Sequence, residues 1–394
     1  MPWKDQGVVN QRMHFVTRLE AGERMAELCR EYGISRKTGY KLMARFKEQG
    51  PEGLFDQSRR PLRISRRTPP EIVATIVALR KQHPTWGARK LRAWLERHEP
   101  ALKLPTRSTF GDILRRNGLI EPRRSKQRTP RYSSQLRTPT KPNDVWCIDF
   151  KGQFRMGDSR LCYPLTVSDQ YSRFLLGVEG LEDTKTFGAR VAMERIFSEY
   201  GLPEVIRSDN GTPFSSRGIA GLSRLSVWWL TLGIQPERIE PGHPEQNGRH
   251  ERMHRTLKKE TARPAKANIL QQQERFDEFV EEFNFQRPHE ALDDRPPGDV
   301  FVLSTRPYVC RPTLEYPLHD LTKVVRDDGS LLLRKRQRFF LGEVLAGQPV
   351  GLRELDDGRW LVSFAHLHLG IFHPLANHFE HLRSDQQPIL EALD

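Results

Sequence analysis

Residues 145–150 read VWCIDF and residues 205–211 read VIRSDNG, so two short apolar segments each carry an aspartate near their end. Apolar runs of this length, rich in β-branched and aromatic residues, predict buried strands. Asp149 lies inside the first strand, where a charge that faces the core destabilises the fold unless it is paired or binds a metal. Asp209 ends the second strand, just before an Asn-Gly turn. Both aspartates are therefore candidates for a functional site.

A third acid, Glu251, follows an Asn-Gly pair in a helix expected over residues 247–260, whose opposite side carries Met253 and Leu257. Acids at strand ends and in the first turn of a helix can converge at one edge of a sheet, which is the geometry that a two-metal site requires. Each acid alone also has an ordinary interpretation, as an edge-strand, turn-capping or surface-helix residue.

The sequence around these acids alternates between strand and helix patterns. Apolar alternation predicts strands, and spacings of three and four predict helices. The expected strands are VWCIDFKGQF (145–154), LCYPLTVSDQYS (161–172), RFLLGVEG (173–180), EVIRSD (204–209) and residues 234–239, and the expected helices are residues 185–200, 222–232, 247–260 and 269–285. Three strands, a helix and a further strand predict an α/β domain with a mixed sheet over residues 143–305.

Positive charge is concentrated in the first third of the chain. The 394 residues carry a formal charge of +14, and residues 1–142 hold 32 Lys plus Arg against 13 Asp plus Glu. The remaining chain holds 32 basic and 37 acidic residues. This asymmetry is typical of a segment that neutralises nucleic-acid phosphates, joined to one that uses carboxylates for another purpose, although a merely basic domain gives the same count.

Composition also excludes several classes of protein. The chain has no run of about 18 apolar residues, which excludes a membrane-spanning helix, and its first residues hold no apolar signal core. Its four cysteines lack CxxC spacing, which argues against a disulfide framework and against a cysteine-ligated zinc. We therefore expect a cytoplasmic protein without a membrane partner.

The first segment, residues 1–57, has the pattern of a helix-turn-helix DNA-binding domain. Helices are expected over residues 11–19, 24–32 and 36–48, with Ser35 as the N-cap of the third. A plain three-helix bundle is the alternative. The candidate DNA-binding residues of the third helix are Arg36, Lys37, Thr38 and Lys41.

Two basic segments flank a second helical unit. Residues 58–68 form a basic arm suited to a DNA backbone or minor groove, or a solvated linker, with Arg59, Arg60, Arg63, Arg66 and Arg67. Residues 69–121 predict a second helix-turn-helix-like DNA-binding domain, which begins at a capping box from Thr68 to Glu71. Further helices are expected near residues 87–97 and 108–117, and Arg107 is a candidate DNA-binding residue. Residues 122–142 are a basic, proline-containing linker with Arg123 and Arg124.

The end of the chain, residues 306–394, is rich in strand patterns again. Two Asp-Asp-Gly turns, at residues 327–329 and 356–358, separate alternating apolar runs. A small β-barrel is the simplest interpretation of this region.

The segments WCIDF (146–150), RSDNGTPF (207–214) and HPEQNGRHERMHRTLKKE (243–260) strongly resemble the catalytic core of bacterial insertion-sequence transposases of the retroviral-integrase (DDE) superfamily. The resemblance spans roughly residues 138–300. It implies a multidomain α+β protein with N-terminal helix-turn-helix units, a central ribonuclease-H-like core and a C-terminal β-barrel. The His/His/Cys/Cys zinc module of retroviral integrases is missing, so recognition of DNA ends must rest on the helical units.

The resemblance also implies a site and a reaction. Asp149, Asp209 and Glu251 match the three catalytic acids, which would hold two Mg²⁺ ions, or Mn²⁺ in their place. Glu245 competes for the third position, because it lies 36 residues after Asp209 whereas Glu251 lies 42 after it. The implied enzyme cleaves the 3′ ends of its element with water and joins them to target DNA, acting on double-stranded DNA as at least a dimer in a bacterial cytoplasm.

Residues beside the third acid suggest how DNA is held. Arg255 and Lys258 follow Glu251 at spacings of four and seven, so the three share one helix face, which suits DNA-end positioning or intrahelical pairing. Asn247 is expected to shape the approach to this helix. Because Mg²⁺ prefers oxygen ligands, we interpret three nearby histidines as loop and surface residues: His243, His250 and His254. We interpret three tryptophans as core residues: Trp146, Trp228 and Trp229.

Two other functions fit parts of the sequence. A DNA-binding regulator or inactive relic of a transposase would keep the helical units without catalysis. A nuclease that acts on RNA–DNA hybrids would keep the acids without needing paired sequence-reading units.

Overall fold

The computed structural model describes residues 7–56, 68–120, 136–216, 218–240, 243, 246, 248–310, 312–334 and 337–382. The chain divides into two compact units, residues 1–68 and residues 69–394, and each is described by itself.

The described residues of the first unit form three α-helices, α1 (Val8–Glu20), α2 (Met25–Glu31) and α3 (Arg36–Gln49), followed by a 3-10 helix at Gly50–Leu54. The Ser35 side chain accepts a hydrogen bond from the Thr38 backbone at 3.1 Å, so the predicted N-cap of the third helix is confirmed. Helix α3 lies close to α2 at Gly39, where an added Cβ would stand 2.7 Å from the Met25 sulfur. The small residue therefore allows the tight packing of a helix-turn-helix.

The second unit opens with three further helices, α4 (Pro70–Gln82), α5 (Ala88–His98) and α6 (Arg107–Arg116), around Trp86 and Phe110, which are fully buried. The predicted capping box is wrong. Pro69 occupies the N-cap position of α4, so Thr68 lies one residue too early, and no side chain among the described residues caps this helix.

A mixed sheet forms the centre of this unit, as the succession of strands and helices along the chain predicted. Its strands run β4–β3–β1–β5–β6, with the short β2 also paired to β3. β3 is antiparallel to β1 and β4, whereas β5 is parallel to both β1 and β6. The strands are β1 (Val145–Phe150), β2 (Phe154–Arg155), β3 (Leu161–Asp169), β4 (Leu175–Leu181), β5 (Val205–Ser208) and β6 (Gln235–Arg238).

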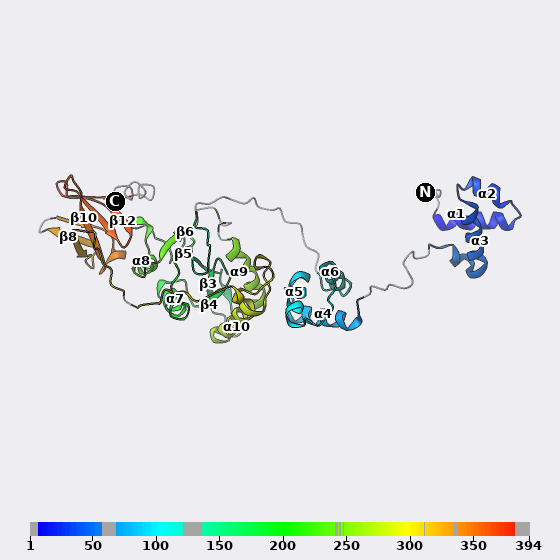
Figure 1. Cartoon of the computed structure of the whole chain (residues 1–394), viewed down its shortest axis with the longest axis horizontal. Helices are drawn as coiled ribbons and strands as arrows, with labels where there is room; N and C mark the ends of the chain where they lie inside the picture. The colour runs from blue at the N-terminus through cyan, green and yellow to red at the C-terminus, as the bar shows by residue number, and fades with distance from the viewer. Residues whose placement is uncertain are drawn as a thin grey trace. The chain divides into compact units, whose positions relative to one another are not determined.

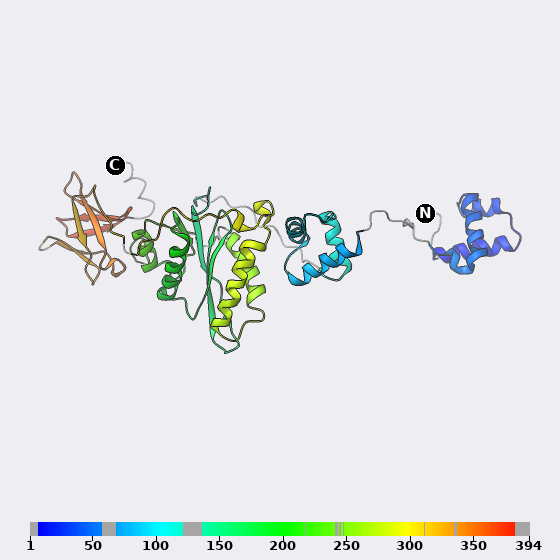
Figure 2. The ribbon, with the colours of Figure 1, turned by 60° about the horizontal axis from the view of Figure 1, so that its bottom comes forward.

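Helices cover both faces of the sheet. Figures 1 and 2 show α7 (Thr186–Tyr200) and α8 (Arg224–Thr231) on one face, and α9 (Gly248–Thr261) and α10 (Ile269–Glu281) on the other. Alternate residues of each strand enter the two cores. Trp146 and Ile148 of β1 pack toward α7 and α8, and the tryptophans predicted as core residues, Trp146, Trp228 and Trp229, are all buried. Cys147 and Asp149 alternate with these apolar residues.

The C-terminal region is strand-rich as predicted, but no closed barrel forms among its described residues. One antiparallel sheet has the order β13–β12–β11–β10–β7, and β8–β9 is a separate hairpin. The apolar face of the five-stranded sheet packs against β8–β9 and against Val227 and Leu230 of α8. This face is therefore buried even where the sheet does not close on itself. The strands are β7 (Leu321–Val324), β8 (Ser330–Arg334), β9 (Gln337–Phe340), β10 (Pro349–Glu354), β11 (Trp360–Phe364), β12 (Leu367–His373) and β13 (His378–His381).

Within the described part of the chain, every helix is too short or too polar to cross a membrane.

Candidate functional site

Two of the predicted acids, Asp149 and Asp209, lie at equivalent positions of neighbouring parallel strands, at one edge of the central sheet. β1 and β5 pair in parallel from Val145 with Val205 to Cys147 with Arg207. Asp149 lies two residues after Cys147, and Asp209 lies two residues after Arg207. The carboxyl ends of adjacent parallel strands meet at one edge, so the pairing brings these two acids to the same place.

Asp209 is fixed by the turn that follows it. Its Oδ1 accepts a hydrogen bond from the Gly211 backbone N–H at 3.0 Å, and the Asn210 amide donates to the Ile239 carbonyl at 2.7 Å. The second bond ties the turn to the end of β6. The Asp209 side chain is partly exposed. Its Oδ1 atom keeps a second lone pair and its Oδ2 atom also carries lone pairs, so the carboxylate can still accept a further ligand.

Glu251 approaches the same edge from the first turn of α9, where it is exposed. The pKa of Asp149 is raised to about 7, chiefly because burial disfavours its carboxylate, and also because the negative charges of Asp209 and Glu251 repel it. Asp209 and Glu251, the other two acids predicted from the sequence, therefore both lie within electrostatic reach of Asp149.

This donor set fits a hard divalent cation. Carboxylate oxygens are the ligands that Mg²⁺ and Mn²⁺ prefer, and mutual repulsion among carboxylates is relieved when a cation lies between them. Besides burial, the negative charges of Asp209 and Glu251 raise the pKa of Asp149, and a cation bound among the three acids would offset that repulsion.

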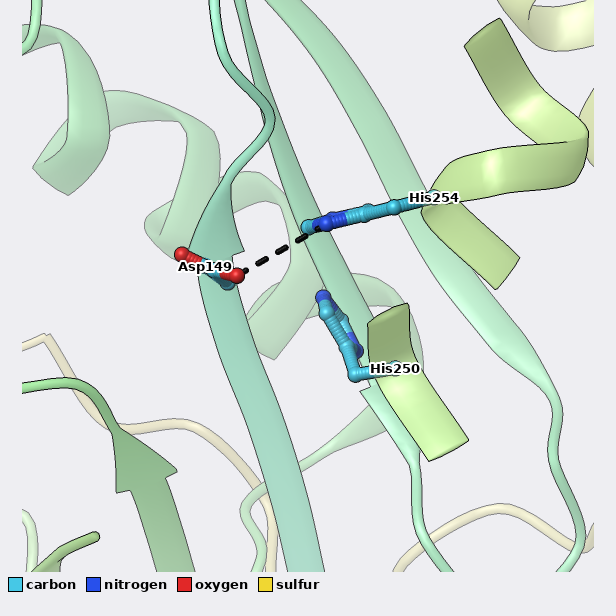
Figure 3. Close-up of side chains that lie close together, drawn as sticks. All are labelled: Asp149, His250 and His254. Atoms are coloured by element: carbon cyan, nitrogen blue, oxygen red, sulfur yellow. Dashed lines mark ion pairs between the residues drawn. The ribbon is translucent and has the colours of Figure 1, made fainter. Parts of the chain in front are cut away.

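The interpretation of two histidines as surface residues is wrong. His250 and His254 are 1% and 4% exposed, on the side of α9 that faces the sheet. Figure 3 shows both rings reaching from α9 toward β1 and Asp149. The Nδ1 atom of His254 lies 3.6 Å from Oδ2 of Asp149, and one ligand atom from each of the three residues lies within 4.8 Å of the others.

Two hydroxyls of β3 contact these rings. Thr166 Oγ1 lies 2.7 Å from His250 Nε2 and 2.6 Å from His254 Nε2, and Ser168 Oγ lies 2.8 Å from His250 Nδ1. Burial lowers the pKa of His250 to about 3. Burial, helped by the charges of His250 and Lys151, lowers the pKa of His254 to about 2, so both rings are neutral at pH 7.

A signal for these histidines was present in the sequence. His250, Met253, His254 and Leu257 follow one another at helical spacings of three and four, which is the period of a buried face. The other two residues are apolar and buried, as predicted. Thr166 and Ser168 were missed because alternate polar residues in a strand usually indicate a solvent-facing side.

A group of three arginines next to α9 was also missed. Burial, together with the positive charges of Arg249 and Arg252, lowers the pKa of Arg173 to about 10. Arg249 and Arg252 belong to the start of α9, whereas Arg173 follows β3. Residues 170–173 and residues 249–252 are far apart in the chain, so no pattern predicted this positive cluster.

The remaining predicted residues fall into three groups. Those exposed on the helices predicted to carry them are Arg36, Lys37, Thr38 and Lys41 on α3, Arg107 on α6, and Arg255 and Lys258 on α9. His243 lies in a loop, 3.9 Å from Glu240, as expected. Outside the described residues lie Arg59, Arg60, Arg63, Arg66, Arg67, Arg123, Arg124, Asn247 and the competing acid Glu245.

Family models match most of the described helical and central segments. Two models of an integrase core domain match residues 139–244 and residues 232–297. A helix-turn-helix domain model matches residues 11–61, and a homeodomain-like domain model matches residues 38–114.

Individual proteins show the same likeness. The chain is 28% identical over 243 residues to an insertion element IS407 protein of Burkholderia multivorans, covering 58% of this chain and 79% of that protein. It is 26% identical over 228 residues to an insertion element IS476 protein of Xanthomonas euvesicatoria, covering 57% of this chain and 63% of that protein. The HTLV-2 integrase catalytic core domain, solved with magnesium, is 14% identical at a TM-score of 0.34, covering 42% of this chain and all of that one.

Residues 139–297 therefore match models of an integrase core domain and residues 11–114 match helix-turn-helix and homeodomain-like models, and the chain is similar to proteins of bacterial insertion elements.

Proposed function

We propose that the chain is a DNA transposase, which binds the terminal inverted repeats of its element and catalyses metal-dependent 3′-end cleavage and strand transfer into target DNA. The observation that carries this proposal is the convergence of Asp149 and Asp209 at one edge of the central sheet, with Glu251 of α9 near enough to Asp149 to raise its pKa. It acts in a bacterial cytoplasm, and synapsis of two ends requires at least a dimer.

The three acids serve as ligands for two Mg²⁺ ions, for which Mn²⁺ can substitute. Such ions supply activation of the attacking oxygen and stabilisation of the leaving oxygen. Asp149 and Asp209 come from strand ends and Glu251 from a helix, and functional groups carried on strands and helices are positioned more precisely than those on loops.

The reaction consists of two in-line displacements at phosphorus. In the first, a water oxygen bonds to the phosphorus of the element end while the bond to the 3′ oxygen breaks, and that oxygen takes up a proton. In the second, the new 3′-OH bonds to a phosphorus of target DNA, loses its proton, and displaces another 3′ oxygen. Bond number is conserved, so no nucleotide cofactor is consumed.

Positive side chains beside the acids would hold the DNA strand. Arg255 and Lys258 extend along α9 from Glu251, and Arg249 and Arg252 lie at the beginning of the same helix. Arginines that repel one another bind phosphate more favourably, because an anion relieves their repulsion. Asn247 is proposed to shape the approach to α9.

Recognition of the element ends is assigned to the helical units. The exposed basic residues of α3 include Arg36, Lys37 and Lys41, and Thr38 lies beside them. A recognition helix presents such residues to the major groove. Arg107 begins α6 in the second helical segment, and the arm and linker residues Arg59, Arg60, Arg63, Arg66, Arg67, Arg123 and Arg124 are proposed to contact the backbone.

The test uses labelled DNA that carries the sequences flanking the gene, with Mg²⁺ or with EDTA. Wild type should give 3′-nicked ends and joined products only with the metal, and Asp209→Asn should give neither. Glu182→Gln, an exposed acid of the same domain, is the matched control and should retain both activities. Binding of the ends without nicking would establish a regulator or relic, and cleavage of RNA–DNA hybrids alone would establish a hybrid nuclease.

A further inference from the structure

The hydroxyl of Thr166 has three partners and only one proton. Its Oγ1 atom lies 3.0 Å from the Asp149 backbone carbonyl, 2.7 Å from His250 Nε2 and 2.6 Å from His254 Nε2. A carbonyl oxygen can only accept, so the Thr166 proton must point to Asp149. Both Nε2 atoms must then carry protons and donate to Oγ1.

The contacts of His250 agree with this assignment. With Nε2 protonated, the Nδ1 atom of a neutral imidazole is an acceptor, and Ser168 Oγ donates to it at 2.8 Å. Both ring nitrogens of His250 are thus occupied by hydroxyls, and the residue is 1% exposed. His250 therefore holds Thr166 in place and has no free lone pair for a metal.

His254 differs at Nδ1. Because its Nε2 atom donates to Thr166, its Nδ1 atom carries a lone pair, which faces Oδ2 of Asp149 at 3.6 Å (Figure 3). This separation is too long for a hydrogen bond. Both atoms attract cations, and the second ring nitrogen is anchored by a hydroxyl, as in metal sites where an outer partner orients a ligating imidazole.

We propose that His254 Nδ1 is a nitrogen ligand of a metal ion bound by Asp149, so that the site has mixed oxygen and nitrogen donors. Atoms 3.6 Å apart can both reach one ion, since metal–nitrogen and metal–oxygen bonds are about 2.0–2.2 Å long. The inference rests on the proposed function in taking Asp149 as a metal ligand, and it adds a residue from outside the acid triad.

A nitrogen ligand changes the preference of the site among metals. Imidazole suits transition metals, whereas Mg²⁺ favours oxygen and binds few nitrogen ligands. The full chain should therefore bind Mn²⁺ more tightly than Mg²⁺, and His254→Gln should reduce that preference by about tenfold, because even the loss of a residue that only orients a ligand typically costs 10–100-fold in metal affinity.

Pulsed electron paramagnetic resonance of the full-length protein with Mn²⁺ alone tests the ligand directly. Wild type should show modulation from a directly bound ¹⁴N nucleus, and labelling with ¹⁵N-histidine should replace it with the ¹⁵N pattern. The signal should persist in His243→Gln, a loop histidine, and vanish in His254→Gln while Mn²⁺ still binds the acids. The labelled wild type keeps the test valid even if the variant does not fold.

The outcomes separate this inference from the proposed function. Bound Mn²⁺ without nitrogen coupling in wild type would overturn the role of His254 and leave the acid site intact. No binding of Mn²⁺ at all would overturn both. Nitrogen-coupled Mn²⁺ in a protein that never nicks its DNA ends would support the ligand and refute the transposase.

Discussion

The Nε atom of Arg89 on α5 lies 2.8 Å from Oδ1 of Asp294, in the segment that follows α10. Two further contacts join the same parts of the second unit, from Arg97 to Asp299 and from His83 to Glu282. Part of the basic charge of the second helical segment is thus neutralised by acids of the core. The cations of α5 that make these pairs are consequently less available to DNA than the exposed Arg107 of α6.

Ion pairs in this region should differ strongly in their contribution to stability. Arg287 and Glu260 are 6% and 13% exposed in their side chains, whereas those of Arg89 and Asp294 are 30% and 28% exposed. Glu260→Ala leaves a buried guanidinium unpaired, so we expect a loss of about 3 kcal/mol in the free energy of unfolding. Asp294→Ala should cost less than about 1 kcal/mol. Denaturant titration measures the free energy of unfolding of both variants. Equal losses in the two would contradict the expectation that the more buried ion pair contributes more to stability.

Lys90 should make stability depend on pH. Burial, then the charge of Arg287, lower its pKa to about 7, although Glu260, Asp294 and Glu290 oppose this shift. An unfolded lysine keeps its proton to about pH 10.4, so between pH 7 and pH 10 the unfolded state binds more protons and stability rises with pH. The destabilisation caused by the buried, charged ammonium group of Lys90 is therefore fully present below pH 7.

Lys90→Met removes that penalty while keeping a side chain of similar length. We expect the variant to be more stable than wild type by on the order of 2 kcal/mol at pH 6, with the difference shrinking toward pH 10. Denaturant titration at several pH values checks this. A difference that stays constant with pH would show that the gain comes from packing and not from the ammonium group.

The sequence allowed prediction of the parts of the site that obey local rules. Asp149 and Asp209 end apolar strands, and parallel pairing of those strands then brings them together. Contacts across the fold were not accessible: His254 meets Thr166 only because α9 packs on β3. Closure of the C-terminal sheet into a barrel is not shown among the described residues, since alternating strands read alike in a barrel and in an open sheet whose apolar face is covered by α8.

Thr166 should be important for the stability of the layer beneath α9. Thr166→Val keeps the shape of the side chain but leaves two buried imidazole N–H groups without an acceptor. Each such group costs about 1–3 kcal/mol, so we expect a loss of roughly 2–4 kcal/mol in the free energy of unfolding. Ser168→Ala frees only one ring nitrogen and should cost about half as much. Equal stability of Thr166→Val and wild type would refute the hydrogen-bond assignment.

The exposed cations of α3 should contribute to DNA affinity through phosphate contacts. We expect Lys41→Ala to weaken binding of the element ends and to reduce the slope of log affinity against log salt concentration by about 1. Arg18→Ala is the control, because Arg18 already pairs with Glu23 and Glu31. Fluorescence anisotropy at several salt concentrations measures both. An unchanged slope for Lys41→Ala would remove this residue from the interface.

The central claim is that the three acids at the edge of β1 and β5 carry out the cleavage of DNA. Single-turnover rates of 3′-end nicking in Mg²⁺ test it most directly, on wild type, Asp149→Asn, Asp209→Asn, Glu251→Gln, Glu245→Gln and the control Glu182→Gln. Nicking should be lost in the first three variants and retained in the last two, with DNA binding unchanged throughout. Wild-type rates in Asp209→Asn, or loss in Glu245→Gln with activity kept in Glu251→Gln, would contradict it.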